Sequence, residues 1–238
     1  MRTHLRELLT LRSSWILLLF ALASKILSGV GTFLREKTGS PIFPNLVAGD
    51  DMAPFFFGIF AAIAISGYFS HGTMTYDLLA NPRRWKIQVS RIASLCLLSL
   101  ATAVVASLAN YGLVQALNLA MNRQALQPSF SKLLLSFFLL LMSSLIYCLI
   151  GSGIGFLLTT TAASIFAYLG IMWGIPVLSM ISGVFNSSLM QKTLTATLAY
   201  VTVHLAPGDK WATSLLILFL WGLACQVAGT VRFRRYKA

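Results

Sequence analysis

The side chains that could take part in chemistry are few in this sequence and lie far apart. The three cysteines each fall within an apolar stretch, and the three histidines fall in three different regions. These six residues are His4, His71, His204, Cys96, Cys148 and Cys225. The sequence contains no HExxH or GxSxG motif, no paired carboxylates in an apolar stretch and no GxxxxGK[ST] loop. We therefore expect no catalytic residues, metal site or nucleotide site in this chain, and we expect the cysteines to be core residues.

One charged residue, Lys25, lies well inside an apolar segment. A charge within a membrane span is costly, so such a residue is a candidate for a substrate path or a contact between subunits. The lysine stem can instead carry the ammonium group to the membrane surface, and both interpretations stay open. Gly174 and Pro176 interrupt a later apolar segment, and broken helices are tolerated where they face protein or water. These three residues are the candidates for lining a path or a dimer seam.

Composition indicates that these residues belong to an all-α membrane protein. The chain has 238 residues, of which 57% are hydrophobic and only 10% are charged, and its mean hydropathy is +0.80. Soluble domains carry about 25% charged residues, and no single aqueous core could hide so much apolar surface. The net charge of +12 could indicate nucleic acid. We expect membrane lipid instead, because the basic residues gather between apolar segments, where they would face anionic headgroups.

Six apolar segments are candidates for membrane spans, each of which needs about 20 residues. They comprise residues 15–33, 54–70, 92–120, 133–158, 162–184 and 212–231. The first imitates a signal peptide, but its apolar run continues to Leu34, so we interpret it as a true span. The fifth is expected to bend or break near Gly174 and Pro176. Glycines 151, 153 and 155, and the series Gly58, Ala62 and Ser66, are small residues expected to let helices approach closely.

Two segments outside the spans are expected to be ordered. Residues 1–14 place three leucines on one helical face, which fits an interfacial helix, although an ordinary basic N-terminus is the alternative. Residues 185–211 are too apolar for a free loop and predict a re-entrant or short surface helix on the outer face before the last span. A mobile loop is the alternative there. Residues 34–53 are expected to form turns.

The basic residues predict the orientation of the chain. With both termini inside, eleven Lys and Arg residues lie on the inner side and six on the outer side, and Lys25 completes the eighteen. The inner residues are Arg2, Arg6, Arg12, Arg83, Arg84, Lys86, Arg91, Arg232, Arg234, Arg235 and Lys237. Because positive charge marks the cytoplasmic side, we expect both termini in the cytoplasm.

The segment 66–91 holds the densest internal basic cluster and lies between the second and third spans. It contains a short helix-compatible piece, residues 69–80, which Asn81-Pro82 should close, because a residue before proline is pushed out of the helical region. The segment is therefore predicted to be a cytoplasmic elbow that another protein contacts.

At this elbow the sequence resembles the permease subunits of type-2 ABC transporters, which have six spans and no ATPase domain of their own. The matching residues are Phe69, Gly72, Thr73, Leu78, Leu79, Pro82, Arg83 and Arg84, with Arg91 further on. Residues 151–164 also resemble the short turn between the fourth and fifth spans of that family. The sequence departs from the family at Tyr68, where a glutamate is common, and this leaves the electrostatics of the elbow open.

The resemblance implies that residues 1–238 form one permease domain of an exporter in the bacterial inner membrane. Residues 69–81 would be the coupling helix that contacts a separate ATPase subunit, which would bind ATP and Mg²⁺ while this chain binds no cofactor. The contact residues would be Phe69, His71, Gly72, Thr73, Met74, Tyr76, Asp77, Leu78 and Leu79. A second permease chain, identical or related, would complete the path for an amphiphilic substrate such as a lantibiotic-type peptide, a drug or a lipid.

Two other classes of function are weighed against this one. A secondary transporter that works without ATP should carry ionisable residues in its spans and internal repeats, but only Lys25 qualifies and no convincing repeat relates residues 1–120 to 121–238. A membrane partner protein without catalytic or transport activity needs no motif at all. An ATPase that co-purifies with the chain would favour the exporter over both.

Overall fold

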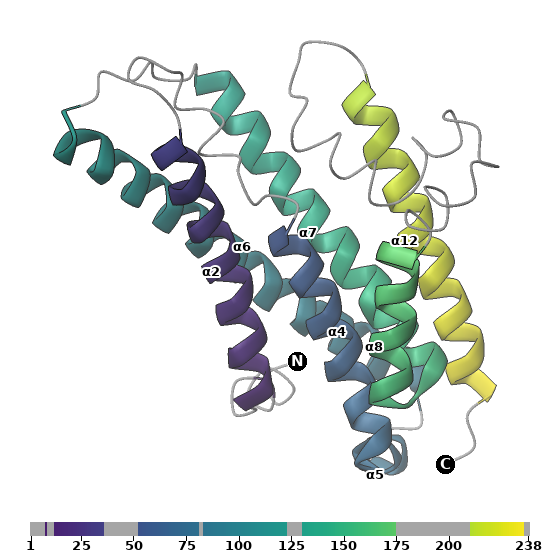
Figure 1. Ribbon diagram of the computed structural model, residues 1–238. Helices are drawn as coiled ribbons and strands as arrows, with labels where there is room; N and C mark the ends of the chain where they lie inside the picture. The colour runs from purple at the N-terminus through teal and green to yellow at the C-terminus, as the bar shows by residue number, and fades with distance from the viewer. Residues whose placement is uncertain are drawn as a thin grey trace.

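The computed structural model describes residue 8 and residues 12–35, 52–80, 83–122, 130–174 and 210–235, and all the elements in these ranges are helical. Five are long: α2 (Arg12–Arg35), α4 (Met52–Ser70), α6 (Arg84–Ala120), α7 (Phe130–Leu158) and α12 (Lys210–Arg235). Two are short: α5 (Thr73–Ala80) and α8 (Thr161–Leu169), which continues as the π-helical turn η1 (Gly170–Gly174). Figure 1 shows the long helices side by side in a bundle, with α5 lying across one end.

Five helices of the described ranges are long and apolar enough to cross a membrane. They contain the predicted first, second, third, fourth and sixth spans, so the membrane character expected from composition is supported. The apolar helix Thr161–Trp173 starts the predicted fifth span but is too short to cross alone, and residues 175–184 lie outside the described ranges. Most of residues 1–14 and 34–53, and nearly all of 185–211, lie outside them as well.

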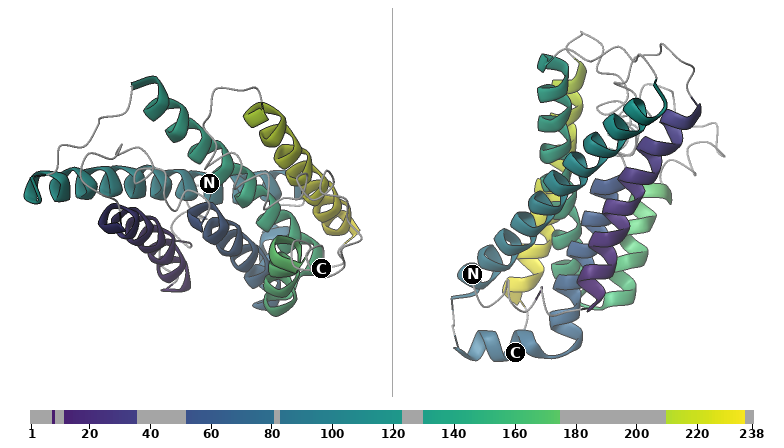
Figure 2. Two further views of the ribbon diagram at one scale, coloured as in Figure 1. Left: turned by 45° about the horizontal axis from the view of Figure 1, so that its top comes forward. Right: turned by 90° about the vertical axis from the view of Figure 1, so that its left-hand side faces the viewer.

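The helix boundaries differ from the prediction mainly at the start of α6. This helix begins at Arg84, eight residues before the predicted third span, and it runs obliquely across the bundle beside α2 (Figure 2). α2 begins and α12 ends at the end of the bundle that carries α5, which is called the elbow end below (Figure 1). Residues 12–14, which were predicted to close an interfacial helix, instead form the first turn of α2.

α7 is the central helix, and glycines bring its backbone close to two neighbours. A Cβ atom on Gly151 would overlap the carbonyl oxygen of Gly58 in α4, and one on Gly153 would overlap the backbone of Cys225 in α12. Small residues permit such approach in membrane bundles, where dispersion contacts and backbone proximity replace the hydrophobic effect. The predicted packing role of these glycines is confirmed. They lie within α7, however, and the turn expected over residues 151–164 is confined to Thr159 and Thr160, between α7 and α8.

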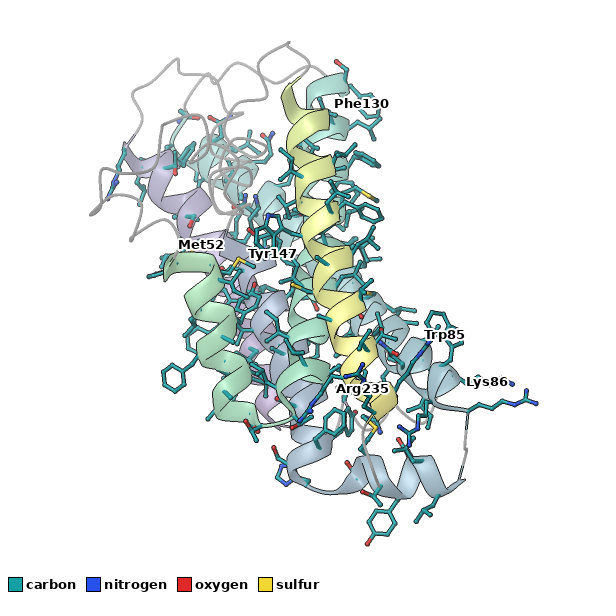
Figure 3. The ribbon with its side chains drawn as sticks, turned by 90° about the vertical axis from the view of Figure 1, so that its right-hand side faces the viewer. Met52, Trp85, Lys86, Phe130, Tyr147 and Arg235 are labelled. Atoms are coloured by element: carbon teal, nitrogen blue, oxygen red, sulfur yellow. The ribbon has the colours of Figure 1, made fainter. Side chains whose placement is uncertain are left out.

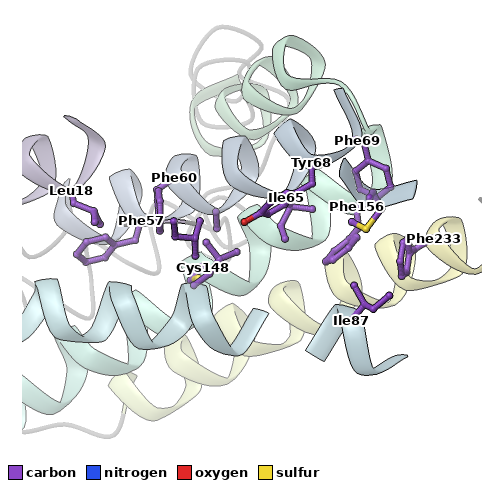
Figure 4. Packing of buried hydrophobic residues seen from close by; sticks show 14 of the residues in the cluster. Leu18, Phe57, Phe60, Ile65, Tyr68, Phe69, Ile87, Cys148, Phe156 and Phe233 are labelled. Carbon is purple, nitrogen blue, oxygen red and sulfur yellow. The ribbon is translucent and has the colours of Figure 1, made fainter. Parts of the chain in front are cut away.

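The largest group of buried apolar side chains follows α4 from mid-bundle to the elbow end (Figure 4). At that end, the rings of Phe69, Phe156 and Phe233 form a mutual cluster with centroids 5.2 to 6.1 Å apart. These rings come from α4, α7 and α12, and edge-to-face aromatic pairs add about 0.5–1.5 kcal/mol each beyond their buried area. The end of α4 is therefore fixed to two helices that are distant from it in sequence.

Candidate functional site: the elbow between α4 and α6

A tight turn at Gly72 separates α4 from α5. Gly72 has a φ of +70°, a conformation that is strained for other residues, and its N–H donates to the carbonyl oxygen of Phe69 over 3.1 Å. The hydroxyl of Thr73 donates to the carbonyl oxygen of Tyr68 over 3.1 Å, which satisfies one of the free carbonyls at the helix end. The short helix predicted over residues 69–80 therefore begins at Thr73, and Phe69 belongs to α4.

α5 has one face turned into the bundle and one turned out. Met74 is fully buried and Leu78 is 8% exposed, whereas Tyr76 is 74% exposed and Leu79 is 75% exposed. Met74 and Leu78 therefore lie opposite Tyr76 on α5. His71 and Thr73 are exposed, and Gly72 is half-buried.

The buried residues of the elbow therefore have a different role from the one predicted for them. Phe69, Met74 and Leu78 pack within the core of this chain, so they support α5 and do not present a surface to a partner. The accessible part of the predicted contact set is His71, Thr73, Tyr76 and Leu79. Tyr76 and Leu79 form an aromatic and apolar pair that the described part of the chain does not cover. Such a pair is typical of residues that another protein buries.

Arg91 is the residue whose environment the sequence did not predict. It was counted among the cations facing the inner surface, but its side chain is only 2% exposed within α6. Its Nη2 group forms an ion pair with the carboxylate of Asp77 in α5, and its guanidinium carbon lies 3.3 Å from the centre of the Tyr68 ring in α4. One guanidinium thus joins the last turn of α4, the middle of α5 and the second turn of α6.

The physical chemistry of this triad follows from its burial. A guanidinium stacks on aromatic faces and is less strongly hydrated than an ammonium group, which makes arginine the cation best suited to such a site. The ion pair is strengthened because water is largely excluded from the arginine, although the Asp77 side chain is 29% exposed. Among the described residues, Nε and Nη1 of Arg91 have no hydrogen-bond partner, so the triad is held by one ion pair and one ring.

Tyr68 and Asp77 together compensate the charge of Arg91 from two different helices. The tyrosine ring offers the electron-rich face to Arg91, and the negative charge is supplied from α5 by Asp77. A signal for this pairing existed in the sequence, because Asp77 is the only acidic residue between positions 52 and 208. A single acid near one end of an apolar segment is expected to find a basic partner.

The basic cluster also joins the start of α6 to the end of α12. Arg84 Nη1 donates to the carbonyl oxygens of Phe233, over 3.0 Å, and Arg234, over 2.7 Å. Free carbonyls at a helix C-terminus carry partial negative charge, so a cation placed there both satisfies and stabilises them. Gln88 Nε2 adds a second link one turn further, to Thr230 Oγ1 over 2.6 Å.

A hydroxyl contact extends the elbow to α8. Ser70 Oγ lies 3.2 Å from Thr161 Oγ1, at the first residue of α8. Together with the Phe69 ring and the Arg91 triad, this contact means that a displacement of α5 would act on α4, α6 and α8 at once. The elbow therefore connects α5 to α4, α6 and α8 through side-chain contacts.

The other candidate residues lie elsewhere. Lys25 is 1% exposed and faces a cavity of about 40 Å³ between α2, α6 and α7, away from the elbow. Gly174 is the last residue of η1, and Pro176 lies outside the described ranges. In the described part of the chain, no three His, Cys, Asp or Glu side chains are grouped closely enough to hold a metal ion.

No protein-family model matches the chain, and a search of curated proteins finds no match either.

Proposed function

We propose that this chain is the membrane permease of an ATP-driven exporter and that α5 is the surface on which a separate ATPase subunit acts. The observation that carries the proposal is the construction of α5. It exposes Tyr76 and Leu79 on one face, while Asp77 and two buried apolar residues fasten the other face to the spans. A helix that only capped the bundle would gain nothing from leaving two large apolar side chains in water.

The proposal assigns each part a physical role. The ATPase would bury Tyr76 and Leu79, and the closing of its nucleotide sites would displace α5. The Arg91 triad and the Phe69 cluster would pass that displacement to α4, α6 and α12. A second permease chain would complete the path, since one bundle of six spans cannot shield an amphiphile from lipid on all sides. Peptides, drugs and lipids of amphiphilic character suit apolar spans with few charges.

The test replaces Tyr76 with aspartate in the permease co-expressed with an ATPase encoded beside it. The variant should insert normally but lose most substrate-stimulated ATP hydrolysis and transport, because a charge would have to be buried at the partner contact. Membrane insertion, ATPase co-purification and ATP-dependent uptake into inverted vesicles would be measured together. Normal transport and hydrolysis by Tyr76→Asp would remove the role proposed for α5.

A matched control is Phe130→Asp. Phe130 is 80% exposed and starts α7 at the end of the bundle opposite α5 (Figure 3). Aspartate is well tolerated in the first turn of a helix, so this variant should keep hydrolysis and transport coupled. Transport that persists in vesicles without any ATPase or ATP would instead favour a secondary transporter.

A further inference from the structure

A groove runs between α6 and α12 at the elbow end of the bundle, separate from the exposed face of α5. It encloses about 460 Å³, within the range of about 300–1,000 Å³ found for ligand pockets. Its walls come from α6 and α12, and Leu149 of α7 contributes to its lining. A second groove of about 420 Å³ shares Leu149 and continues along α7 and α12 toward the other end.

The α12 side of these grooves is one continuous helical stripe. Its members recur every three or four residues: Leu215, Leu216, Phe219, Leu223, Gln226, Val227, Thr230, Val231 and Arg234. From Leu215 to Arg234 the rise is about 28 Å at 1.5 Å per residue, which is close to the hydrocarbon thickness of a bilayer. The groove at the elbow end is therefore about as long as the half of the bilayer nearest to it.

The amide nitrogens and the hydroxyl group inside the groove already form hydrogen bonds within the protein. Gln88 Nε2 donates to Thr230 Oγ1 over 2.6 Å, and Gln226 Nε2 donates to the carbonyl oxygen of Leu149 over 2.7 Å. Thr230 Oγ1 in turn donates to the carbonyl oxygen of Gln226 over 2.7 Å. A ligand inside the groove thus meets mainly apolar side chains, among them Val89 and Val227. Such a lining suits a hydrocarbon chain better than a polar molecule.

The mouth of the groove is basic and aromatic. Arg234 lines it, and Trp85, which is 63% exposed, lies beside it. Figure 3 shows Trp85, Lys86 and Arg235 gathered at this end of the bundle. Tryptophan favours the level of lipid headgroups, and arginine binds phosphate through paired N–H groups. An apolar groove that opens at such a mouth matches a ligand with a hydrocarbon chain and an anionic head.

A second copy of this chain fits the mouth poorly. Two copies in one membrane share the same orientation, so a symmetric contact across this face would bring one basic mouth against the other. Asp77 is the one acidic residue of the described ranges that could balance the positive charge of the two mouths, and it is already paired with Arg91. Like charges placed against each other disfavour a contact.

We propose that the groove between α6 and α12 binds an acyl chain of an anionic phospholipid from the bilayer leaflet at the elbow end, with the lipid phosphate at Arg234. The inference does not depend on the exporter function. A lipid held there would cover the seam at which Arg84 and Gln88 join α6 to α12, so it would stabilise the same junction that anchors the elbow.

Trp85 provides the probe for the test. The full chain would be reconstituted into phosphatidylcholine vesicles that contain phosphatidylglycerol, with bromine on the acyl chains of one lipid or the other. The contribution of Trp85 to the fluorescence is the difference between the emission of the unchanged protein and that of the Trp85→Phe variant. Brominated phosphatidylglycerol should quench it more than brominated phosphatidylcholine, and Arg234→Gln should reduce the preference about fivefold, the effect of about one basic residue at an anionic surface.

The matched control is Arg35→Gln, which removes an exposed arginine at the opposite end of the bundle and should leave the preference unchanged. Equal quenching by both lipids would overturn the proposal. So would a preference that Arg234→Gln does not alter, or the absence of quenching by either lipid, which would mean that protein covers the groove. If Arg234→Gln does not insert, Val227→Phe should fill the groove and lower the quenching, and unchanged quenching in that variant would overturn the proposal.

Discussion

Arg91 and Lys25 are both almost completely buried cations in an apolar bundle, but the surroundings of the two side chains differ. Arg91 lies near the elbow end, 2% exposed, between a carboxylate and an aromatic ring from two other helices. Lys25 is 1% exposed in α2 and borders a cavity of about 40 Å³. Among the described residues, the lining of that cavity carries hydroxyl groups from Ser107, Tyr111 and Ser136 and no carboxylate.

The difference indicates two uses of a buried charge. At Arg91 the compensating carboxylate and aromatic ring come from neighbouring helices of the same chain. Removing either one leaves the cation less well compensated in an environment that excludes water. At Lys25 the neutral hydroxyl lining can reorient, and the cavity has room for about one water molecule. We therefore expect changes around Arg91 to act mainly on stability and coupling, and changes at Lys25 to act mainly on what passes through or binds in the bundle.

The largest effect is expected from Asp77→Asn, which removes the charge paired with Arg91. Breaking a buried ion pair costs about 3–5 kcal/mol, and the partial exposure of Asp77 lowers the expected loss to about 2–3 kcal/mol, at or below the lower end of that range. The free energy of unfolding in detergent would be measured by denaturant titration.

The control is the double variant Asp77→Asn with Arg91→Met. It should lose less than the sum of the single losses, because the stranded charge has been removed as well. Additive losses would show that the two side chains do not interact in the folded protein.

A smaller effect is expected at the aromatic side of the triad. Tyr68→Leu removes the ring beneath Arg91 and should cost about 1–2 kcal/mol, the range of a desolvated cation–π contact, plus some packing. Tyr68→Phe keeps the ring face beneath Arg91. Its cost should exceed the cost of a tyrosine-to-phenylalanine exchange at a site without a cation by less than about 0.5 kcal/mol. Thermal unfolding would be compared in both variants. If Tyr68→Leu costs the same with Arg91→Met as without it, the ring does not stabilise the cation.

The contrast between the two cations also shows how far the sequence could predict the structure. Periodicity and hydropathy are local properties, so they predicted the long apolar helices and the short helix that follows the second of them, but not the burial of Met74 and Leu78, which were expected to contact a partner. The glycines of α7 were recognised as packing residues because a missing side chain on an apolar helix has few other uses. These predictions needed no knowledge of which helices are neighbours.

The position of Arg91 could not be predicted in this way. We interpreted basic residues near an apolar segment as markers of the membrane surface, and we therefore predicted that the third span begins after Arg91. In the structure, α6 begins at Arg84. The burial of Arg91 depends on α5 turning back beneath α6, which brings Asp77 to it. That approach depends on the left-handed turn at Gly72, and on the Phe69 cluster formed with α7 and α12. Such contacts join segments up to 164 positions apart, from Phe69 to Phe233, and no local pattern encodes them.

The smallest effect on stability is expected at Lys25, where the effect on function should be the clearest. Lys25→Leu removes a buried charge and keeps an apolar side chain of similar volume beside Leu133 and Leu140. Leucine keeps the apolar contacts of the lysine stem, and volume-conserving exchanges usually cost little, so the free energy of unfolding should change by less than about 1.5 kcal/mol. Membrane insertion should be normal for the same reason. If Lys25 serves the substrate path or the seam with a second chain, which is one of the two interpretations of the sequence, uptake of several amphiphiles into vesicles should change in rate or preference. Lys25→Arg, which keeps the charge, should retain more of the original preference than Lys25→Leu.

Unchanged uptake of every amphiphile by Lys25→Leu would leave Lys25 with a role in packing alone. A large loss of stability would instead make Lys25 a second structural cation like Arg91.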